Sequence, residues 1–142
     1  MDARTLCFTP ATELAAMIAA KAVSPVDVTE AVLRRIEAAQ PHLNAFITVC
    51  GERALEEARA AEARVVAGCD LPPLLGVPFS AKDLLNSAGV ATTFGSKVLS
   101  GNLPDSDGLA IARMRTAGAI LIGKTTTPEF GHKPMTEALS LI

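Results

Sequence analysis

Residues 75–83 read Leu-Gly-Val-Pro-Phe-Ser-Ala-Lys-Asp, an apolar stretch that ends in two charged side chains. Its length and apolar character predict a strand from Leu75 to Ala81. Pro78 has no N–H group to donate to a neighbouring strand, so we expect it at the start of this strand or at an edge of the sheet. The stretch therefore predicts a strand that ends at a lysine.

Lys82 has the clearest chemical potential in this stretch. Side chains alternate along a strand, so Ser80 and Lys82 emerge on one face while Asp83 points away from Lys82. Residues 92–96 read Thr-Thr-Phe-Gly-Ser, where the glycine would let the backbone approach a ligand closely. Composition alone favours an ordinary solvated lysine at a strand end. Burial, by contrast, would favour the neutral amine and allow Lys82 to act as a base near neutral pH.

The rest of the chain alternates helical and extended patterns, which predicts an α/β fold. N-terminal helices are followed by part of a mixed sheet covered by helices, an incomplete arrangement within one domain. Residues 1–70 are expected to be mainly helical, and residues 71–142 to begin the α/β core. Helices are expected behind Thr9-Pro10, from Ser24-Pro25 to Pro41, from about Glu52 to Ala67 and from about Gly108 to Ala117. The last of these helices is expected to have Asp105-Ser106-Asp107 as its cap. Further strands are expected within Asn44–Val49 and Ala119–Ile122.

Composition excludes several classes of protein. The net charge of −2 over 142 residues mixes both signs, so no basic surface for nucleic acid or an anionic membrane is expected. No apolar run approaches the roughly 18 residues of a membrane span, and the N-terminus does not resemble a signal peptide. Cys7, Cys50 and Cys69 are too widely spaced for a disulfide framework, and His42 and His132 are too isolated for a metal site. We therefore expect a cytoplasmic protein without a metal.

Residues 118–125, Gly-Ala-Ile-Leu-Ile-Gly-Lys-Thr, match the phosphate-loop pattern GxxxxGK[ST]. That motif needs an open loop whose N–H groups surround a phosphate, with a strand before it and a long helix after it. Here the four intervening residues are apolar, a predicted helix precedes Gly118, and Pro128 follows shortly after. We interpret the segment as a helix end followed by a buried strand, and expect no nucleotide binding.

Taken together, the motifs resemble the amidase signature family. The pieces occur in the family's order at compatible spacing, and the similarity covers nearly the whole chain. They are the segments 75–83 and 92–96, Asp107, residues 115–125, Pro128-Glu129-Phe130, the two N-terminal helices and Leu43-Asn44-Ala45-Phe46.

The resemblance implies an amide hydrolase that cleaves C–N bonds of a small amide with a Ser–cis-Ser–Lys triad and no cofactor. It assigns the catalytic lysine to Lys82, which would take a proton from a bridging serine that in turn activates the nucleophilic serine. A serine hydroxyl is a poor nucleophile without such a base. The resemblance gives Glu129 an architectural role. Lys97 and Lys124 do not follow the Gly-Val-Pro strand, so we expect them to matter much less for turnover.

The family's serines and oxyanion-stabilising backbone come from a Gly-Gly-Ser-Ser-Gly-Gly type segment further along, and this sequence contains no Gly-Ser-Ser. Ser96 follows a glycine but precedes Lys97, and the family pattern breaks near Ser140. We interpret the chain as the N-terminal third of a stand-alone amidase, truncated before its serines and inactive alone. A sheet that stops after Ile122 would leave an open edge, so we also expect self-association.

Two other interpretations stay open. The amidotransferase component that forms glutaminyl-tRNA belongs to the same family. Its members usually read Met-Asp-Glu-Phe-Ala where residues 127–134 of this chain read Thr-Pro-Glu-Phe-Gly-His-Lys-Pro, which favours a stand-alone amidase. The other interpretation is a non-catalytic remnant or interaction module, which association with a second chain carrying Gly-Ser-Ser-Gly would support.

Overall fold

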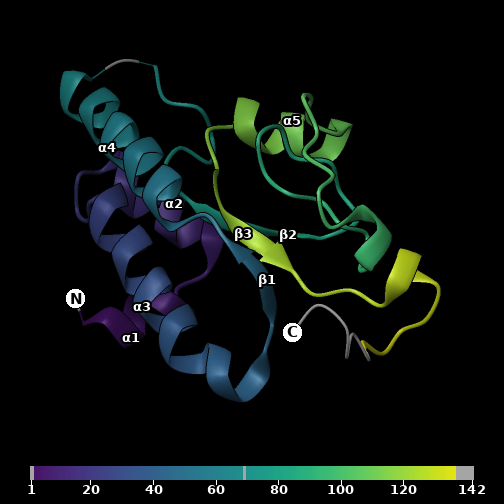
Figure 1. The fold of residues 1–142 in the computed structure, drawn as a ribbon. Coiled ribbons are helices and arrows are strands. Elements are labelled where there is room, and N and C mark those ends of the chain that lie inside the picture. The colour runs from purple at the N-terminus through teal and green to yellow at the C-terminus, as the bar shows by residue number, and fades with distance from the viewer. Residues whose placement is uncertain (1, 69, 137–142) are drawn as a thin grey trace.

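Figure 1 shows the computed structural model of the chain, which describes residues 2–68 and 70–136. Cys69 and Ser140, both considered above, lie outside the described residues. The helices and strands within these ranges are, in chain order, α1 (Ala3–Phe8), α2 (Ala11–Ala19), α3 (Pro25–Leu43), β1 (Phe46–Val49), α4 (Gly51–Ala67), β2 (Pro78–Lys82), α5 (Leu109–Thr116) and β3 (Ile120–Thr125), with short 3₁₀ turns at Lys97–Leu99 and Glu129–Gly131.

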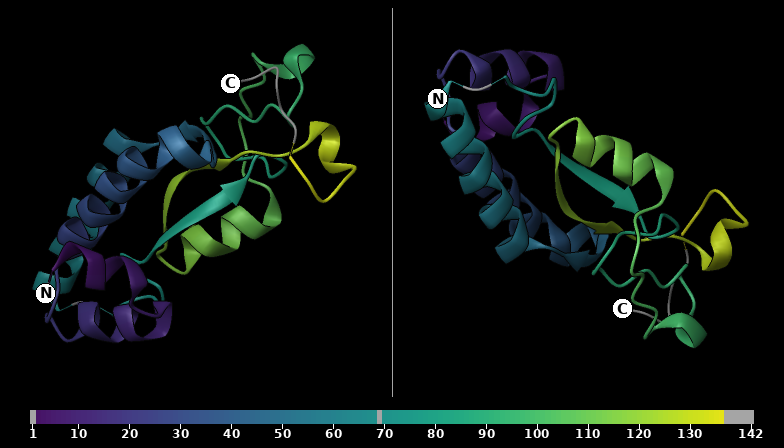
Figure 2. Two further views of the ribbon diagram at one scale, coloured as in Figure 1. Left: turned by 90° about the horizontal axis from the view of Figure 1, so that it is seen from below. Right: turned by 90° about the horizontal axis from the view of Figure 1, so that it is seen from above.

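The three strands form a mixed sheet in the order β1-β3-β2, which confirms the α/β prediction. β3 lies in the centre, antiparallel to β1 and parallel to β2. Helices α3 and α4 lie on one side of the sheet and α5 lies on the other (Figure 2). Pro78 is the first residue of β2, which is an edge strand of the described sheet, as the missing N–H group requires.

The strand predicted at Ala119–Ile122 is β3, which begins one residue later and continues to Thr125. It has a neighbour on each side, so the edges of the described sheet are β1 and β2. Self-association through an open edge of the sheet stays a prediction.

Several helix boundaries also differ from the sequence predictions. Helix α1 was not predicted, and Thr9 ends it rather than capping α2. Pro41 lies inside α3 instead of ending it, because the N–H of Asn44 still bonds to the carbonyl of Gln40 at 2.8 Å. Asn44 then stops the helix in the left-handed conformation.

The predicted acidic cap of α5 is likewise wrong. Gly108 occupies the N-cap position, where no side-chain cap hydrogen bond forms. Asp107 instead accepts a hydrogen bond from the N–H of Ala88 at 2.7 Å and pairs with Arg115 at 3.1 Å. The aspartate therefore fastens the loop after β2 to α5.

Alanine lets helix α4 approach the sheet closely. Ala54 and Ala58 are fully buried and share a cluster with Ile120 and Ile122 of β3 and Ile36 of α3. A short side chain at these positions leaves room for the large β-branched side chains of the central strand, and Phe46 packs against the same cluster.

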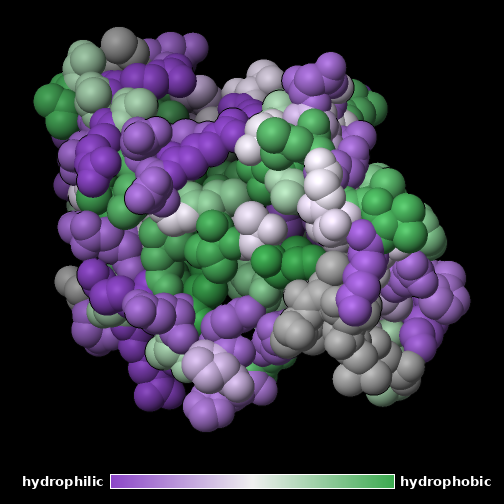
Figure 3. All heavy atoms as spheres, in the orientation of Figure 1, coloured by the Kyte–Doolittle hydropathy of each residue, from purple (hydrophilic) through white to green (hydrophobic). Residues whose placement is uncertain are grey.

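Apolar side chains also reach the surface over the sheet. On the face seen in Figure 3, hydrophobic residues gather in the middle, where Figure 1 draws β1 and β3. Val49 of the edge strand β1 is 47% exposed.

Gly118 fixes the distance between the segments that lead into β2 and β3. Its φ is +86°, and a Cβ atom at this position would lie 2.8 Å from the Cα of Leu75. Two backbone hydrogen bonds join the segments at this point, from Leu74 N–H to Ala117 O at 2.8 Å and from Gly76 N–H to Gly118 O at 3.0 Å. A side chain at position 118 would therefore push the two strand entries apart.

We expect Gly118→Ala to lower the free energy of unfolding by about 2–5 kcal/mol, which combines left-handed strain of about 1–2 kcal/mol with overpacking of about 1–3 kcal/mol. Gly68 is the matched control, because its φ is +70° and nothing lies within 4 Å of its added Cβ. Gly68→Ala should therefore cost only the strain. Urea denaturation of both variants measures the difference, and equal losses would contradict the close-packing argument.

Candidate active site

Lys82 lies at the carboxyl end of β2, beside the carboxyl end of β3. The two strands are parallel and pair Lys82 with Thr125. Ligands of parallel α/β sheets bind outside the carboxyl ends of the strands, so this is the edge where a site is expected. Ser80 and Lys82 are exposed while Ala81 is buried, which confirms that the serine and the lysine share one face.

Among the described residues, the buried lysine is Lys124, and its burial was not predicted from the sequence. Lys82 is exposed, so the described residues do not supply the desolvation considered for it. Lys124, in the middle of the sheet, is 0% exposed. Burial lowers the pKa of Lys124, although the nearby carboxylate of Asp83 acts in the opposite direction.

Asp83 compensates the charge of Lys124. The Lys124 ammonium lies 3.5 Å from Asp83 Oδ1, and both side chains are 0% exposed. The same ammonium donates to the carbonyl of Leu85 at 2.6 Å and to the hydroxyl of Thr92 at 2.7 Å. Asp83 Oδ2 accepts from the N–H and the hydroxyl of Thr93, at 3.0 and 2.6 Å. Together these contacts join the ends of β2 and β3 to the loop that follows β2.

This pair could be anticipated only in part. Asp83 was expected to point away from Lys82, and the structure buries Asp83 while Lys82 stays exposed. Lys124 was considered only within the phosphate-loop pattern, whose apolar residues 119–122 were predicted as a buried strand. The observed strand extends from Ile120 to Thr125 and therefore includes Lys124. The sequence signal was a charged residue, Lys124, directly after an apolar run. Its partner Asp83 lies far away in the sequence, so the pairing itself could not be predicted.

The loops beyond the two strands are also tied to each other. The Ser96 hydroxyl donates to Glu129 Oε1 at 2.6 Å, and the N–H of Phe130 donates to the carbonyl of Phe94 at 2.7 Å. Both phenylalanines adopt left-handed backbone conformations, with φ of +54° for Phe94 and +51° for Phe130. Strained backbone of this kind persists only where surrounding contacts hold it. These contacts agree with the architectural role expected for Glu129.

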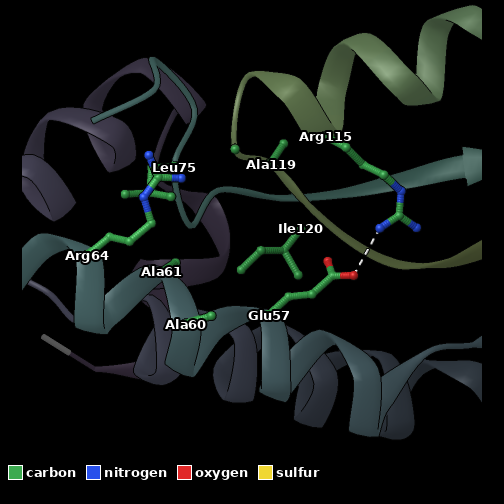
Figure 4. A pocket seen from close by; sticks show the side chains of 9 residues that line it. Glu57, Ala60, Ala61, Arg64, Leu75, Arg115, Ala119 and Ile120 are labelled. Atoms are coloured by element: carbon green, nitrogen blue, oxygen red, sulfur yellow. Dashed lines mark hydrogen bonds and ion pairs between the residues drawn. The ribbon is translucent and has the colours of Figure 1, made fainter. Parts of the chain in front are cut away.

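A separate pocket lies at the opposite end of the strands, between α4 and the turn that leads into β3 (Figure 4). Glu57, Arg64 and Arg115 surround it together with Leu75 and Ile120. Figure 4 shows Glu57 and Arg115 pointing toward one another, 2.9 Å apart. Because this pocket adjoins the start of β3, we do not assign it to the candidate site at the carboxyl ends.

The described residues offer neither a metal cluster nor a membrane span. Residues 2–68 and 70–136 contain no group of three or more His, Cys, Asp or Glu side chains arranged to hold a metal ion. Over the same residues, no helix combines the length and apolar character that crossing a membrane requires.

The sequence matches the Amidase family over residues 27–140. Among curated proteins, a glutamyl-tRNA(Gln) amidotransferase component from Acidothermus cellulolyticus is 46% identical over 127 residues, which are 89% of this chain and 25% of that protein. The chain therefore belongs to the amidase family. It spans about a quarter of the length of the curated relatives that it matches.

Solved structures agree with this assignment. A peptide amidase from Stenotrophomonas maltophilia has a TM-score of 0.80 and 36% identity, covering 87% of this chain and 26% of that one. A bacterial aryl acylamidase of the amidase signature enzymes has a TM-score of 0.86 and 28% identity, covering 91% of this chain and 27% of that one. The helices and mixed sheet thus have the amidase-signature α/β fold.

The buried pair yields a stability prediction. Lys124→Met leaves Asp83 buried without its partner, and Asp83→Asn does the converse, so each should lower the free energy of unfolding by about 3–5 kcal/mol. The double variant should lose clearly less than the sum of the single losses, since neither charge is left alone. Urea denaturation of the four proteins gives the coupling free energy. Simple additivity would contradict a direct interaction.

The pH dependence follows from the lowered pKa of Lys124. Between that pKa and the ordinary value of 10.5, the unfolded chain binds more protons than the folded chain. The free energy of unfolding should therefore rise with pH across this interval. Burial raises the pKa of the Cys50 thiol, which produces the opposite slope, so the measurement is made in a Cys50→Ala background. The Lys124→Met/Asp83→Asn double variant should lack the rise, and a rise of equal size in it would contradict the assignment.

Proposed function

We propose that this chain carries the catalytic lysine of an amide hydrolase, and that the lysine is Lys82. The supporting observation is its position: an exposed lysine at the carboxyl end of a parallel strand, within the Gly-Val-Pro stretch of an amidase-family chain. Ligands reach parallel sheets at this edge. We also propose that residues 1–142 form the N-terminal part of one amidase domain and that the protein is cytoplasmic.

The proposed chemistry is hydrolysis of a C–N bond by a Ser–cis-Ser–Lys triad. Neutral Lys82 accepts a proton from a bridging serine, which accepts one from the nucleophilic serine as that oxygen attacks the amide carbonyl. The proton then returns along the same path to the leaving amine, and water releases the acyl group from the serine in a second cycle. Lys82 thus acts twice, as base and then as acid. The proposal requires no cofactor.

The two serines must come from outside this sequence, which has no Gly-Ser-Ser. We therefore expect no turnover from residues 1–142 alone. The measurement is hydrolysis of a panel of aryl and aliphatic amides and an activated ester. Turnover that a serine-directed fluorophosphonate abolishes would contradict this expectation.

A complete enzyme provides the test of Lys82. We would join residues 1–142 to the remaining segment of the Stenotrophomonas maltophilia peptide amidase, of which this chain covers 26% at 36% identity. Lys82→Ala should lower amide turnover by about 10²–10⁴-fold, as loss of a general base does. Lys82→Arg should fail equally, because guanidinium does not release its proton at these pH values.

Lys97→Ala is the matched control, since Lys97 is exposed on the neighbouring 3₁₀ turn and should leave turnover unchanged. Near-normal turnover of Lys82→Arg would show that position 82 needs only a positive charge, and the role of a neutral base would be wrong.

A second candidate function is that of an amidotransferase component that works on glutamyl-tRNA(Gln). The observation in its favour is the 46% identity to the Acidothermus cellulolyticus amidotransferase component, whose name describes this activity. The sequence Thr-Pro-Glu-Phe-Gly at residues 127–131 favours a stand-alone amidase instead. Stable co-purification of the completed chain with other amidotransferase components, with little hydrolysis of free amides, would reverse this preference.

A further inference from the structure

Asp83 is fixed through both its backbone and its side chain. Its N–H donates to the carbonyl of Thr125 at 3.0 Å, and its carbonyl accepts from the N–H of Phe94 at 3.1 Å. Its carboxylate accepts two hydrogen bonds from Thr93 and lies 3.5 Å from the ammonium of Lys124. The residue directly after Lys82 is therefore held through its N–H, its carbonyl and its carboxylate.

This fixation determines where Lys82 can point. Asp83 begins the turn after β2, in which the carbonyl of Lys82 accepts from the N–H of Leu85 at 3.0 Å, so holding Asp83 in the interior fixes the backbone from which Lys82 faces outward. Asp83 is 0% exposed while Lys82 is exposed at the end of β2. If Asp83 left its buried position, the strand end would be free to turn and Lys82 would lose its fixed direction.

Lys124 extends the same restraint to the loop that follows. Its ammonium donates to the carbonyl of Leu85, two residues after Asp83, and to the hydroxyl of Thr92. Thr92 is also held through its carbonyl, which accepts from the amide of Asn102 at 2.7 Å. The pair therefore fixes backbone on both sides of the loop that begins beside Lys82.

We propose that the Asp83–Lys124 pair is a positioning unit for Lys82: it holds the carboxyl end of β2 so that the lysine faces the site. This inference rests on the proposed function of Lys82. Neither Asp83 nor Lys124 touches substrate in this proposal. This positioning role replaces the expectation from sequence that Lys124 matters much less for turnover, because that expectation did not include the buried contact with Asp83. Proton transfer needs heavy atoms about 2.6–3.2 Å apart, and a misplacement of about 1 Å costs on the order of 10²-fold in rate. A unit that fixes the direction of Lys82 therefore contributes to turnover as well as to folding.

A purely structural role of the Asp83–Lys124 pair and a role in positioning Lys82 predict different effects on turnover, so an experiment can separate them. An apolar pair of similar volume often replaces a buried ion pair without loss of stability. If Asp83 and Lys124 only fill and stabilise the interior, such a pair should preserve turnover. If they position Lys82, the apolar pair should preserve folding but not turnover, because the hydrogen bonds to Leu85, Thr92 and Thr93 are gone.

The test uses the completed enzyme described above and measures kcat, KM and the melting temperature of each variant. We expect Asp83→Leu/Lys124→Met to lower kcat by about 10²-fold while KM changes by less than about threefold. Thr93→Val is a milder variant that removes the hydroxyl donor to Asp83, and with it the acceptor for the N–H of Gly95, while it keeps the backbone N–H that donates to Asp83. It should lower kcat by about 3–10-fold at a temperature where the variant is folded, because the smaller misplacement costs less than the full 10². The lost buried hydrogen bonds should lower the melting temperature modestly.

The control for lost stability is Leu14→Ala. Leu14 of α2 is 4% exposed and belongs to the core cluster with Leu6 and Ile18, a different cluster from the one that contains Ala81 of β2 and Leu121 of β3. This variant should lower the melting temperature and leave kcat unchanged at a temperature where the protein is folded.

The outcomes separate this inference from the proposed function. If Lys82→Ala leaves turnover intact, the proposed function fails and the inference fails with it. If Lys82→Ala abolishes turnover but the folded apolar pair has normal kcat, the inference alone is overturned. Should the apolar pair not fold, Thr93→Val decides at a temperature where it and Leu14→Ala are both folded: a normal kcat overturns the inference, and a kcat reduced in Thr93→Val but not in Leu14→Ala supports it.

Discussion

The contacts of the buried Lys124 ammonium hold together the carboxyl ends of β2 and β3, where the candidate site lies. Taking a charge out of water is costly unless another charge and further hydrogen bonds replace the lost solvation. Asp83, Leu85 and Thr92 provide that replacement. Because they come from a strand end and a loop, compensating one charge fixes the relative position of β3, β2 and the segment that follows.

The parallel pairing of β2 and β3 makes this compensation possible. Parallel strands end at the same edge of a sheet, so a residue late in β3 and the residue just after β2 meet there. The turn that begins at Asp83 then separates two adjacent charges into different environments. Asp83 enters the interior and Lys82 faces outward. The Lys-Asp dipeptide therefore combines one exposed residue with one that anchors the strand.

Local sequence rules predicted the elements that depend on local physics. Pro78 lies at the start of an edge strand because it lacks an N–H donor, although the strand was predicted to begin at Leu75 and to end at Ala81. Helix α3 begins behind the capping hydroxyl of Ser24, and α4 ends at Gly68 in the left-handed conformation, both as predicted. The expected cap at Asp107 failed because its carboxylate has other partners: it accepts from the N–H of Ala88, distant in sequence, and pairs with Arg115 in the last turn of α5 instead of with the first N–H groups of that helix.

The same limit applied to the candidate site. Lys82 could be singled out because its strand and the surrounding motifs are contiguous in sequence. The burial of Lys124 could not, because its environment is assembled from segments that only the fold brings together. A lysine in a Gly-Lys-Thr sequence has the same local appearance whether it contacts a phosphate or a buried carboxylate. The four residues before Gly123 favoured a strand, and the sheet then decided what the lysine would meet.

The contrast between the two lysines also constrains how Lys82 could become a base. Water stabilises an ammonium group, and a neutral amine is favoured only when that solvation is removed. The chain already desolvates one lysine, Lys124, but there the carboxylate of Asp83 opposes the lowering of the pKa by burial, and the hydrogen bonds to Leu85 and Thr92 give the side chain a structural role. Lys82 has the opposite surroundings, because it is exposed at the end of its strand. Under the function proposed for Lys82, its activation would therefore require cover from residues other than those described, and the segment that brings the serines would supply it.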